Sequence, residues 1–165
     1  SNLGAKTVLA LDKLDYRLHV SKKMHATHTV NVDKEDVFET VREVTEGRMA
    51  DLVVEIVGHQ QETLNQCLHL VKRGGTILAF GVPDDEVYRF DFGRFYRQNI
   101  TLIGSVGPEM QNDIPLAMDM IVQGRVNVSP IISHKLPFDR VQRGVEIFTH
   151  RTDGAIKVVL NYGGM

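Results

Sequence analysis

Asp12 is the residue of this sequence whose type and position point most directly to chemistry. It follows an apolar run at residues 7–11 that has the composition of a buried strand. A carboxylate at the carboxyl end of such a strand can accept hydrogen bonds from both hydroxyls of an adenosine ribose, while its charge repels a 2′-phosphate. The same carboxylate could instead cap the helix that follows, so the neighbouring residues have to decide between a ligand-binding and a capping role.

Glycines at the ends of three further apolar runs favour the ligand-binding role. They are Gly58 after residues 52–57, Gly81 after residues 76–80, and Gly104 with Gly107 around the end of residues 100–105. Each glycine taken alone is explained by a turn. Three in register at the carboxyl ends of parallel strands leave space for a flat ligand along the edge of the sheet. The charge of Asp12 in addition indicates NAD rather than NADP.

The sequence contains neither the pattern of a pyrophosphate-binding loop nor that of a metal site. A G-x-G-x-x-G loop for a pyrophosphate would precede the strand that carries Asp12 by about 20 residues, and the chain has only a few residues there. His25 and His28 are close together, but no cysteine or acidic residue joins them at the spacing of metal ligands. Cys67 lies on an apolar helical stripe, which favours a buried thiol over a nucleophile. We therefore expect neither a phosphate loop nor a metal site in this chain.

The elements that must position these residues alternate between apolar strand-like runs and stretches of helical spacing, as in α/β proteins. The predicted strands of the main sheet occupy residues 7–11, 29–32, 52–57, 76–80 and 100–105. Apolar residues at helical spacing, starting from Val37, Leu64 and Ile114, predict helices that each pack one stripe on the sheet. Residues 83–99 are predicted to form a polar loop. This order predicts right-handed crossovers and a doubly wound, mostly parallel sheet.

The pattern changes after Gly124. A short strand at residues 131–135, a helix around residues 140–149 and a final strand at residues 155–160 form a tail that need not belong to the main sheet. We therefore expect two parts, a partial nucleotide-binding domain at residues 1–126 and a closing segment at residues 127–165.

Composition restricts the class of protein further. The 165 residues suffice for one compact core. The 19 Lys and Arg against 21 Asp and Glu give a net charge of −2, without a basic patch for nucleic acid or an anionic membrane. No apolar run approaches the roughly 20 residues of a membrane span, and the single cysteine excludes an intramolecular disulfide. We expect a cytoplasmic location, and because Ser1 is not an initiator Met we interpret the sequence as a fragment.

Short runs along the whole sequence carry a resemblance to one family. In the first part they are Leu3-Gly4-Ala5 before the strand that ends in Asp12, DLVVEIVG at residues 51–58, RGGT at residues 73–76, NITLIGS at residues 99–105 and GRV at residues 124–126. In the tail they are PIISH at residues 130–134, LPF at residues 136–138 and GAIKVVL at residues 154–160. In this order and spacing the runs resemble the cofactor-binding half of the medium-chain, zinc-type alcohol dehydrogenases. The resemblance implies a Rossmann-like sheet that lacks its first, central strand and its glycine-rich loop.

The resemblance also implies NAD, preferred over NADP, as the cofactor. The implied contacts are Asp12 and Arg17 at the adenosine ribose, Ile56, Gly58 and His59 along the adenine and ribose wall, backbone at Phe80, Val82, Ser105 and Gly107 at the nicotinamide, and Lys157 at the pyrophosphate. The alternatives are a solvated loop for His59 and a solvated strand edge for Lys157.

The intact family passes a hydride between an alcohol and NAD, with a zinc ion that polarises the oxygen. The resemblance thus implies that the chain is part of an alcohol or polyol dehydrogenase and is inactive alone. It implies no catalytic residues and no zinc ligands in this chain. Alcohol or carbonyl substrates would bind through an absent domain. It also implies a homo-oligomer that pairs through the edge strand at residues 100–105. Two alternatives stay open: a nucleoside-dependent methyltransferase-like domain, which would close with an antiparallel hairpin, and a folded or oligomerising fragment that binds no cofactor.

Overall fold

The computed structural model describes residues 4–163, so Leu3 in the first resembling run lies outside the described part of the chain. The strands are β1 (Leu9–Asp12), β2 (His28–Asn31), β3 (Ala50–Glu55), β4 (Val71–Ala79), β5 (Thr101–Gly104), β6 (Ile132–Pro137) and β7 (Lys157–Asn161). The helices are α1 (Asp15–Lys23), α2 (Val37–Val44), α3 (Gln61–Leu70), α4 (Phe92–Arg97), α5 (Asp113–Val122) and α6 (Val141–His150), with short 3-10 turns η1 (Ser129–Ile131) and η2 (Phe138–Arg140). The chain divides into two compact units: Asp36–Glu109 form one, and the residues before and after them form the other.

All paired strands run parallel, which confirms the predicted α/β class. Within the described residues they form three sheets, β1–β2, β3–β4–β5 and β6–β7. The β6–β7 pair is separate from the other strands, as the change of pattern after Gly124 predicts. The resemblance places β1 and β3 on either side of an absent strand. In residues 4–163 these two strands belong to different sheets and are not paired with each other.

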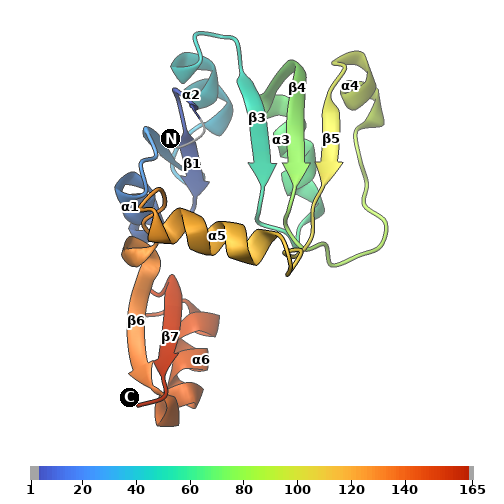
Figure 1. Ribbon diagram of the computed structural model, residues 1–165. Helices are drawn as coiled ribbons and strands as arrows, with labels where there is room; N and C mark the ends of the chain where they lie inside the picture. The colour runs from blue at the N-terminus through green and yellow to red at the C-terminus, as the bar shows by residue number, and fades with distance from the viewer. Residues whose placement is uncertain (1–3, 164–165) are drawn as a thin grey trace. The chain divides into compact units, whose positions relative to one another are not determined.

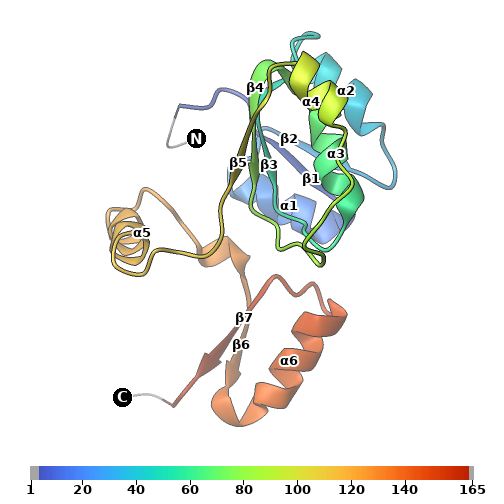
Figure 2. The same ribbon diagram turned by 90° about the vertical axis from the view of Figure 1, so that its right-hand side faces the viewer.

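In the unit of residues 36–109, helices α2, α3 and α4 lie on one face of the β3–β4–β5 sheet (Figure 1 and Figure 2). Side chains alternate along β3, so that Val53 is buried on the helix-covered face while Leu52 and Val54 are exposed on the other. Ile77 of β4 and Leu68 of α3 are fully buried between the sheet and the helices. The apolar stripe of α3 therefore packs as its spacing predicts.

Replacing Leu68 with alanine tests this core. The side chain has no exposed surface, so the truncation removes buried methyl groups and leaves a cavity. We expect Leu68→Ala to lower the free energy of unfolding by about 2–5 kcal/mol, measured by urea denaturation. Leu116→Ala on α5 is the matched control, because Leu116 is 58% exposed and its truncation should cost less than about 0.5 kcal/mol. Equal losses in the two variants would contradict the burial of Leu68.

In the other unit, α1 packs against β1 and β2, and α6 packs against β6 and β7. Leu18 is the buried residue of α1. Gly144 lets α6 approach its sheet closely, since a Cβ there would lie 3.3 Å from Cγ1 of Val158. The hydroxyl of Tyr16 donates to the carbonyl oxygen of Ala155 at 3.2 Å and so connects α1 to the segment before β7. This connection places the start of β7 beside α1.

Two expectations are wrong. Residues 83–99, predicted as a polar loop, contain α4. Asp91 caps this helix by accepting from the backbone N–H of Arg94 at 2.9 Å, but the helix is too short to show a clear apolar period. The apolar stripe of α5 does not pack on a sheet, because none of its side chains is buried and Met118 is 60% exposed. Helical spacing predicts the type of an element, whereas burial depends on the surface that the rest of the chain supplies.

Strand boundaries agree with the prediction to within two residues, apart from the start of β4. β4 begins at Val71 rather than Thr76, and it contains Gly74 and Gly75, which precede the predicted strand. Gly74 has a φ of 70°, and the pairing of β3 with β4 shifts register before Thr76. The glycine pair therefore forms an irregularity inside β4 instead of preceding it.

Candidate functional site

Asp12 is the last residue of β1, at the carboxyl end predicted for it. Its Oδ1 accepts a hydrogen bond from the backbone N–H of Leu14 at 2.9 Å, which stabilises the turn into α1. The N-cap residue of α1 is Leu14 and has no side-chain cap, so Asp12 does not hold the N-cap position. The Oδ2 of Asp12 lies 3.6 Å from Nη1 of Arg17, and the two side chains are 27% and 33% exposed. Both groups are therefore open to a ligand.

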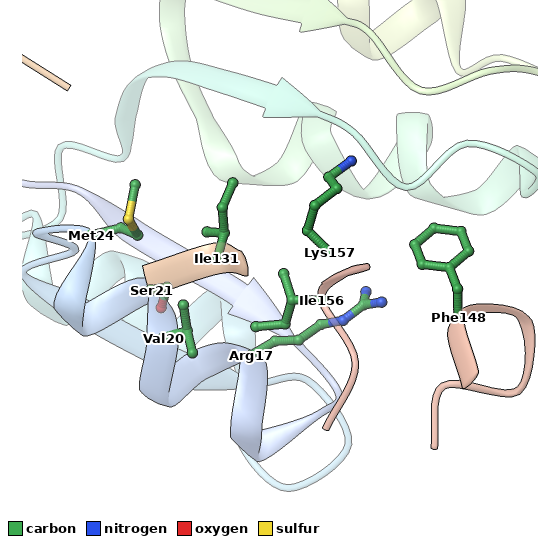
Figure 3. A pocket seen from close by; sticks show the side chains of 8 residues that line it. All are labelled: Arg17, Val20, Ser21, Met24, Ile131, Phe148, Ile156 and Lys157. Atoms are coloured by element: carbon green, nitrogen blue, oxygen red, sulfur yellow. The ribbon is translucent and has the colours of Figure 1, made fainter. Parts of the chain in front are cut away.

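Arg17 also lines a pocket of this unit together with Lys157, as Figure 3 shows. The pocket lies between α1, η1, the end of α6 and the start of β7. Its lining residues are Arg17, Val20, Ser21, Met24, Ile131, Phe148, Ile156 and Lys157. Two of these side chains are cationic, none is acidic, and most of the others are apolar. Such a lining favours an anionic group on a ligand that also has apolar surface.

The two cations of this pocket are incompletely paired. Nε of Arg17 is the one buried side-chain nitrogen or oxygen in residues 4–163 without a hydrogen-bond partner. Lys157, the first residue of β7, is exposed and takes part in none of the ion pairs of the described residues. A phosphate group would compensate the charge of both side chains. The residues present therefore fit a phosphorylated ligand.

Other predicted contacts lie at the carboxyl ends of β3 and β4, in the unit of residues 36–109. Gly58 and His59 follow β3 with φ angles of 61° and 53°, so two successive residues adopt the left-handed conformation. The N–H of His59 donates to the carbonyl oxygen of Val82 at 2.8 Å, and its Nδ1 is hydrogen-bonded to Oδ1 of Asp84. Ile56 is 67% exposed. The loops after β3 and β4 are therefore joined and leave an apolar side chain accessible.

Backbone N–H groups at the ends of β4 and β5 are already engaged. The N–H of Phe80 donates to the carbonyl oxygen of Glu55 at 2.8 Å, and the N–H of Ser105 donates to that of Ala79 at 3.0 Å. Gly107 has a φ of 58°, and nothing lies within 4 Å of the position that a Cβ would take there. The N–H groups of Phe80 and Ser105 are therefore not available to a ligand.

The predicted residues thus fall into two groups, one in each unit. One group is Asp12, Arg17 and Lys157, and the other is Ile56, Gly58, His59, Phe80, Val82, Ser105 and Gly107.

Sequence reasoning missed Glu55, which ends β3 and is buried. Its signal in the sequence is an acidic residue at a strand position that alternation with the exposed Leu52 and Val54 assigns to the core.

Cys67 lies on the buried side of α3 and is 6% exposed, as its apolar stripe predicts. Burial raises the pKa of its thiol to about 12, and the negative charge of Glu55 adds to the rise. At pH 8 the folded chain should react with dithionitrobenzoate on the order of 100-fold more slowly than the urea-unfolded chain, because the thiolate is the reactive form. Equally fast labelling of the folded and unfolded chain would contradict the buried thiol.

Parallel strands, with an acid at the end of β1 and glycines after β3 and β4, define a Rossmann-like α/β protein. The chain belongs to the zinc-binding dehydrogenase family, whose sequence pattern matches residues 1–123. This membership confirms the resemblance that the sequence runs indicate.

Named relatives and solved structures agree with this family. The L-threonine 3-dehydrogenase of Bacillus subtilis (strain 168) is 31% identical over 157 residues, which cover 95% of this chain and 44% of that protein. An alcohol dehydrogenase of Cupriavidus necator is 29% identical and is matched over 95% of this chain and 43% of its own length. The structure of an alcohol dehydrogenase from Thermus sp. ATN1 has a TM-score of 0.85 at 29% identity, over 96% of this chain and 45% of that one. The chain therefore spans less than half the length of these relatives.

Proposed function

We propose that this chain is the cofactor-binding portion of an NAD-dependent alcohol or polyol dehydrogenase. The observation that carries the proposal is the arrangement of three charged side chains in one unit. The carboxylate of Asp12 ends β1, the guanidinium of Arg17 lies 3.6 Å from it, and the ammonium group of Lys157 lines the same pocket as Arg17. A dinucleotide requires an acceptor for its ribose hydroxyls and cations for its pyrophosphate. Membership of the zinc-binding dehydrogenase family supports the same function.

Each residue has a distinct role at the adenosine end of the cofactor. Asp12 accepts hydrogen bonds from the adenosine ribose, and its charge disfavours the 2′-phosphate of NADP. Arg17 lies beside Asp12 at the ribose, and Lys157 compensates the charge of the pyrophosphate. The adenine and ribose wall consists of Ile56, Gly58 and His59.

At the nicotinamide end, carbonyl oxygens accept hydrogen bonds from the carboxamide and so fix the face that the ring presents. We assign this role to backbone at Phe80, Val82, Ser105 and Gly107. Bound NAD supplies the ring that takes up or releases a hydride. The chain's own contribution is to bind and orient the cofactor, and we assign no catalytic residue to it.

Only membership of the zinc-binding dehydrogenase family connects zinc with the proposed function. In a dehydrogenase it polarises the oxygen of the alcohol or carbonyl substrate. In residues 4–163, no group of three or more His, Cys, Asp or Glu side chains is arranged to hold a metal ion. We therefore derive no step of the reaction from zinc. The relatives named alcohol dehydrogenase and L-threonine 3-dehydrogenase support a small substrate with a hydroxyl or carbonyl group.

We further propose a homo-oligomer that pairs through β5. This strand is at the edge of its sheet, and all of its residues are exposed, Leu102 and Ile103 included. An exposed apolar edge offers unpaired backbone groups to a second copy of the same strand.

A cytoplasmic location and the division at residue 126 stay predictions. The buried, unpaired thiol of Cys67 supports a reducing compartment. Among the helices of the described residues, none is both long and apolar enough to cross a membrane.

The methyltransferase-like alternative is not favoured. That class would close with an antiparallel hairpin, whereas β6 and β7 pair in parallel, with Leu136 opposite Leu160. Membership of the zinc-binding dehydrogenase family also favours a dehydrogenase over a methyltransferase.

Calorimetric titration of the chain with NAD, AMP and S-adenosylmethionine tests the proposed function. We expect NAD and AMP to bind and S-adenosylmethionine not to bind. Binding of S-adenosylmethionine alone would instead favour the methyltransferase-like domain. If none of the three binds to a chain that circular dichroism shows to be folded, the fragment that binds no cofactor becomes the better description.

A further inference from the structure

Glu55 is the one buried acidic residue among residues 4–163, and no ion pair accounts for it. It ends β3 and is 7% exposed. Acidic side chains are rarely buried unless they are paired or hydrogen-bonded. Glu55 takes part in none of the ion pairs of the described residues. Its partners come from the backbone.

The carboxylate of Glu55 holds the first turn after β3. Its Oε1 accepts hydrogen bonds from the N–H groups of Val57 and Gly58, each at 2.9 Å. Hydrogen bonds to a charged acceptor are stronger than neutral ones. They hold Gly58 at a φ of 61° and so direct the chain into His59, whose φ of 53° is also left-handed. That conformation is unfavourable for a residue with a side chain, so the turn needs this support.

The same residue also holds the end of β4. The carbonyl oxygen of Glu55 accepts from the N–H groups of Phe80 at 2.8 Å and Gly81 at 2.9 Å. Gly81 also lies against the carboxylate, because a Cβ there would be 2.4 Å from Oε2. Backbone N–H groups of two loops therefore converge on one residue.

We propose that Glu55 is the positioning residue of the adenosine-binding strand ends. Its carboxylate fixes the turn at Gly58 and His59, and its backbone ties that turn to the loop after β4, so that the turn meets adenosine already formed. This inference rests on the proposed function. A preformed turn avoids an ordering cost on binding, and its loss should therefore appear as weaker adenosine binding.

Two substitutions of Glu55 and one control test this role, with AMP as the probe of the adenosine half. Glu55→Leu removes both acceptor oxygens, whereas Glu55→Gln keeps one. Glu62→Leu replaces an exposed acid on α3 of the same unit and serves as the matched control. In an NMR titration of the chain, we expect AMP affinity to fall about tenfold or more in Glu55→Leu and about threefold or less in Glu55→Gln. Glu62→Leu should bind like the wild type.

A second measurement distinguishes a role of Glu55 in positioning the turn after β3 from a role in the stability of the fold alone. In Glu55→Gln the amide proton resonances of Val57 and Gly58 should move upfield, because their hydrogen bonds lose a charged acceptor. The rest of the spectrum should stay that of the wild-type fold. This readout decides the question even if Glu55→Leu does not fold.

Wild-type AMP affinity in a folded Glu55→Leu variant would overturn the proposal, and so would unchanged resonances of Val57 and Gly58 in Glu55→Gln. A wild-type chain that binds neither AMP nor NAD would contradict the proposed function instead. In that case the resonances still show whether Glu55 holds the turn. The two failures are therefore distinguishable.

Discussion

Asp12→Asn should weaken the binding of NAD by about tenfold and shift the preference of the chain toward NADP by on the order of 100-fold. Asparagine keeps an oxygen for the N–H of Leu14, which lies 2.9 Å from Oδ1 in the wild type, so the turn into α1 is preserved. The variant loses the charge that repels a 2′-phosphate and that strengthens hydrogen bonds to the ribose. Arg17, 3.6 Å from Asp12 in the wild type, is then free to meet the phosphate.

Calorimetric titrations with NAD and with NADP measure both effects of this substitution. Asp139→Asn is the matched control, because Asp139 is exposed in η2, and it should leave both affinities unchanged. If Asp12→Asn keeps the wild-type ratio of NAD to NADP affinity, the assignment of Asp12 to the adenosine ribose is wrong.

Gly81→Ala should lower the free energy of unfolding by about 3 kcal/mol and weaken NAD binding by about tenfold or more. A Cβ at this position would lie 2.3 Å from the backbone nitrogen of Gly58 and 2.4 Å from Oε2 of Glu55. Atoms cannot approach this closely, and a backbone atom cannot move aside as a flexible side chain can. The loops after β3 and β4 must therefore separate, and the proposed adenine wall moves with them.

Gly104→Ala is the matched control for this substitution within the same unit, since nothing lies within 4 Å of its Cβ position. Neither Gly81 nor Gly104 has a positive φ, so backbone strain does not enter the comparison. Urea denaturation of the two variants measures the difference. Similar losses of stability in both would mean that the two loops are not in the close contact described.

The parallel α/β class and the position of Asp12 could be predicted because both follow from local patterns. Short apolar runs rich in Val, Ile, Leu and Thr mark each strand, and apart from the start of β4 their ends agree with the structure to within two residues. Asp12 directly follows the first of these runs, so its place at the end of β1 needs no knowledge of the fold.

Features that depend on distant residues could not be predicted in the same way. Only the fold shows that N–H groups of Gly58 and Phe80 both converge on Glu55. The pocket that Arg17 shares with Lys157 joins residues from nearly opposite ends of the chain. The exposure of α5 likewise depends on which surface faces the helix, and helical spacing does not encode that surface.

An amide-resolved NMR titration of the chain with NAD tests the central claim most directly. Saturating NAD should shift the resonances of Asp12, Arg17 and Lys157 in one unit and of Gly58 and His59 in the other. A chain whose dispersed spectrum shows it to be folded, and whose five amides do not respond to NAD, would contradict the assignment of these residues to the cofactor.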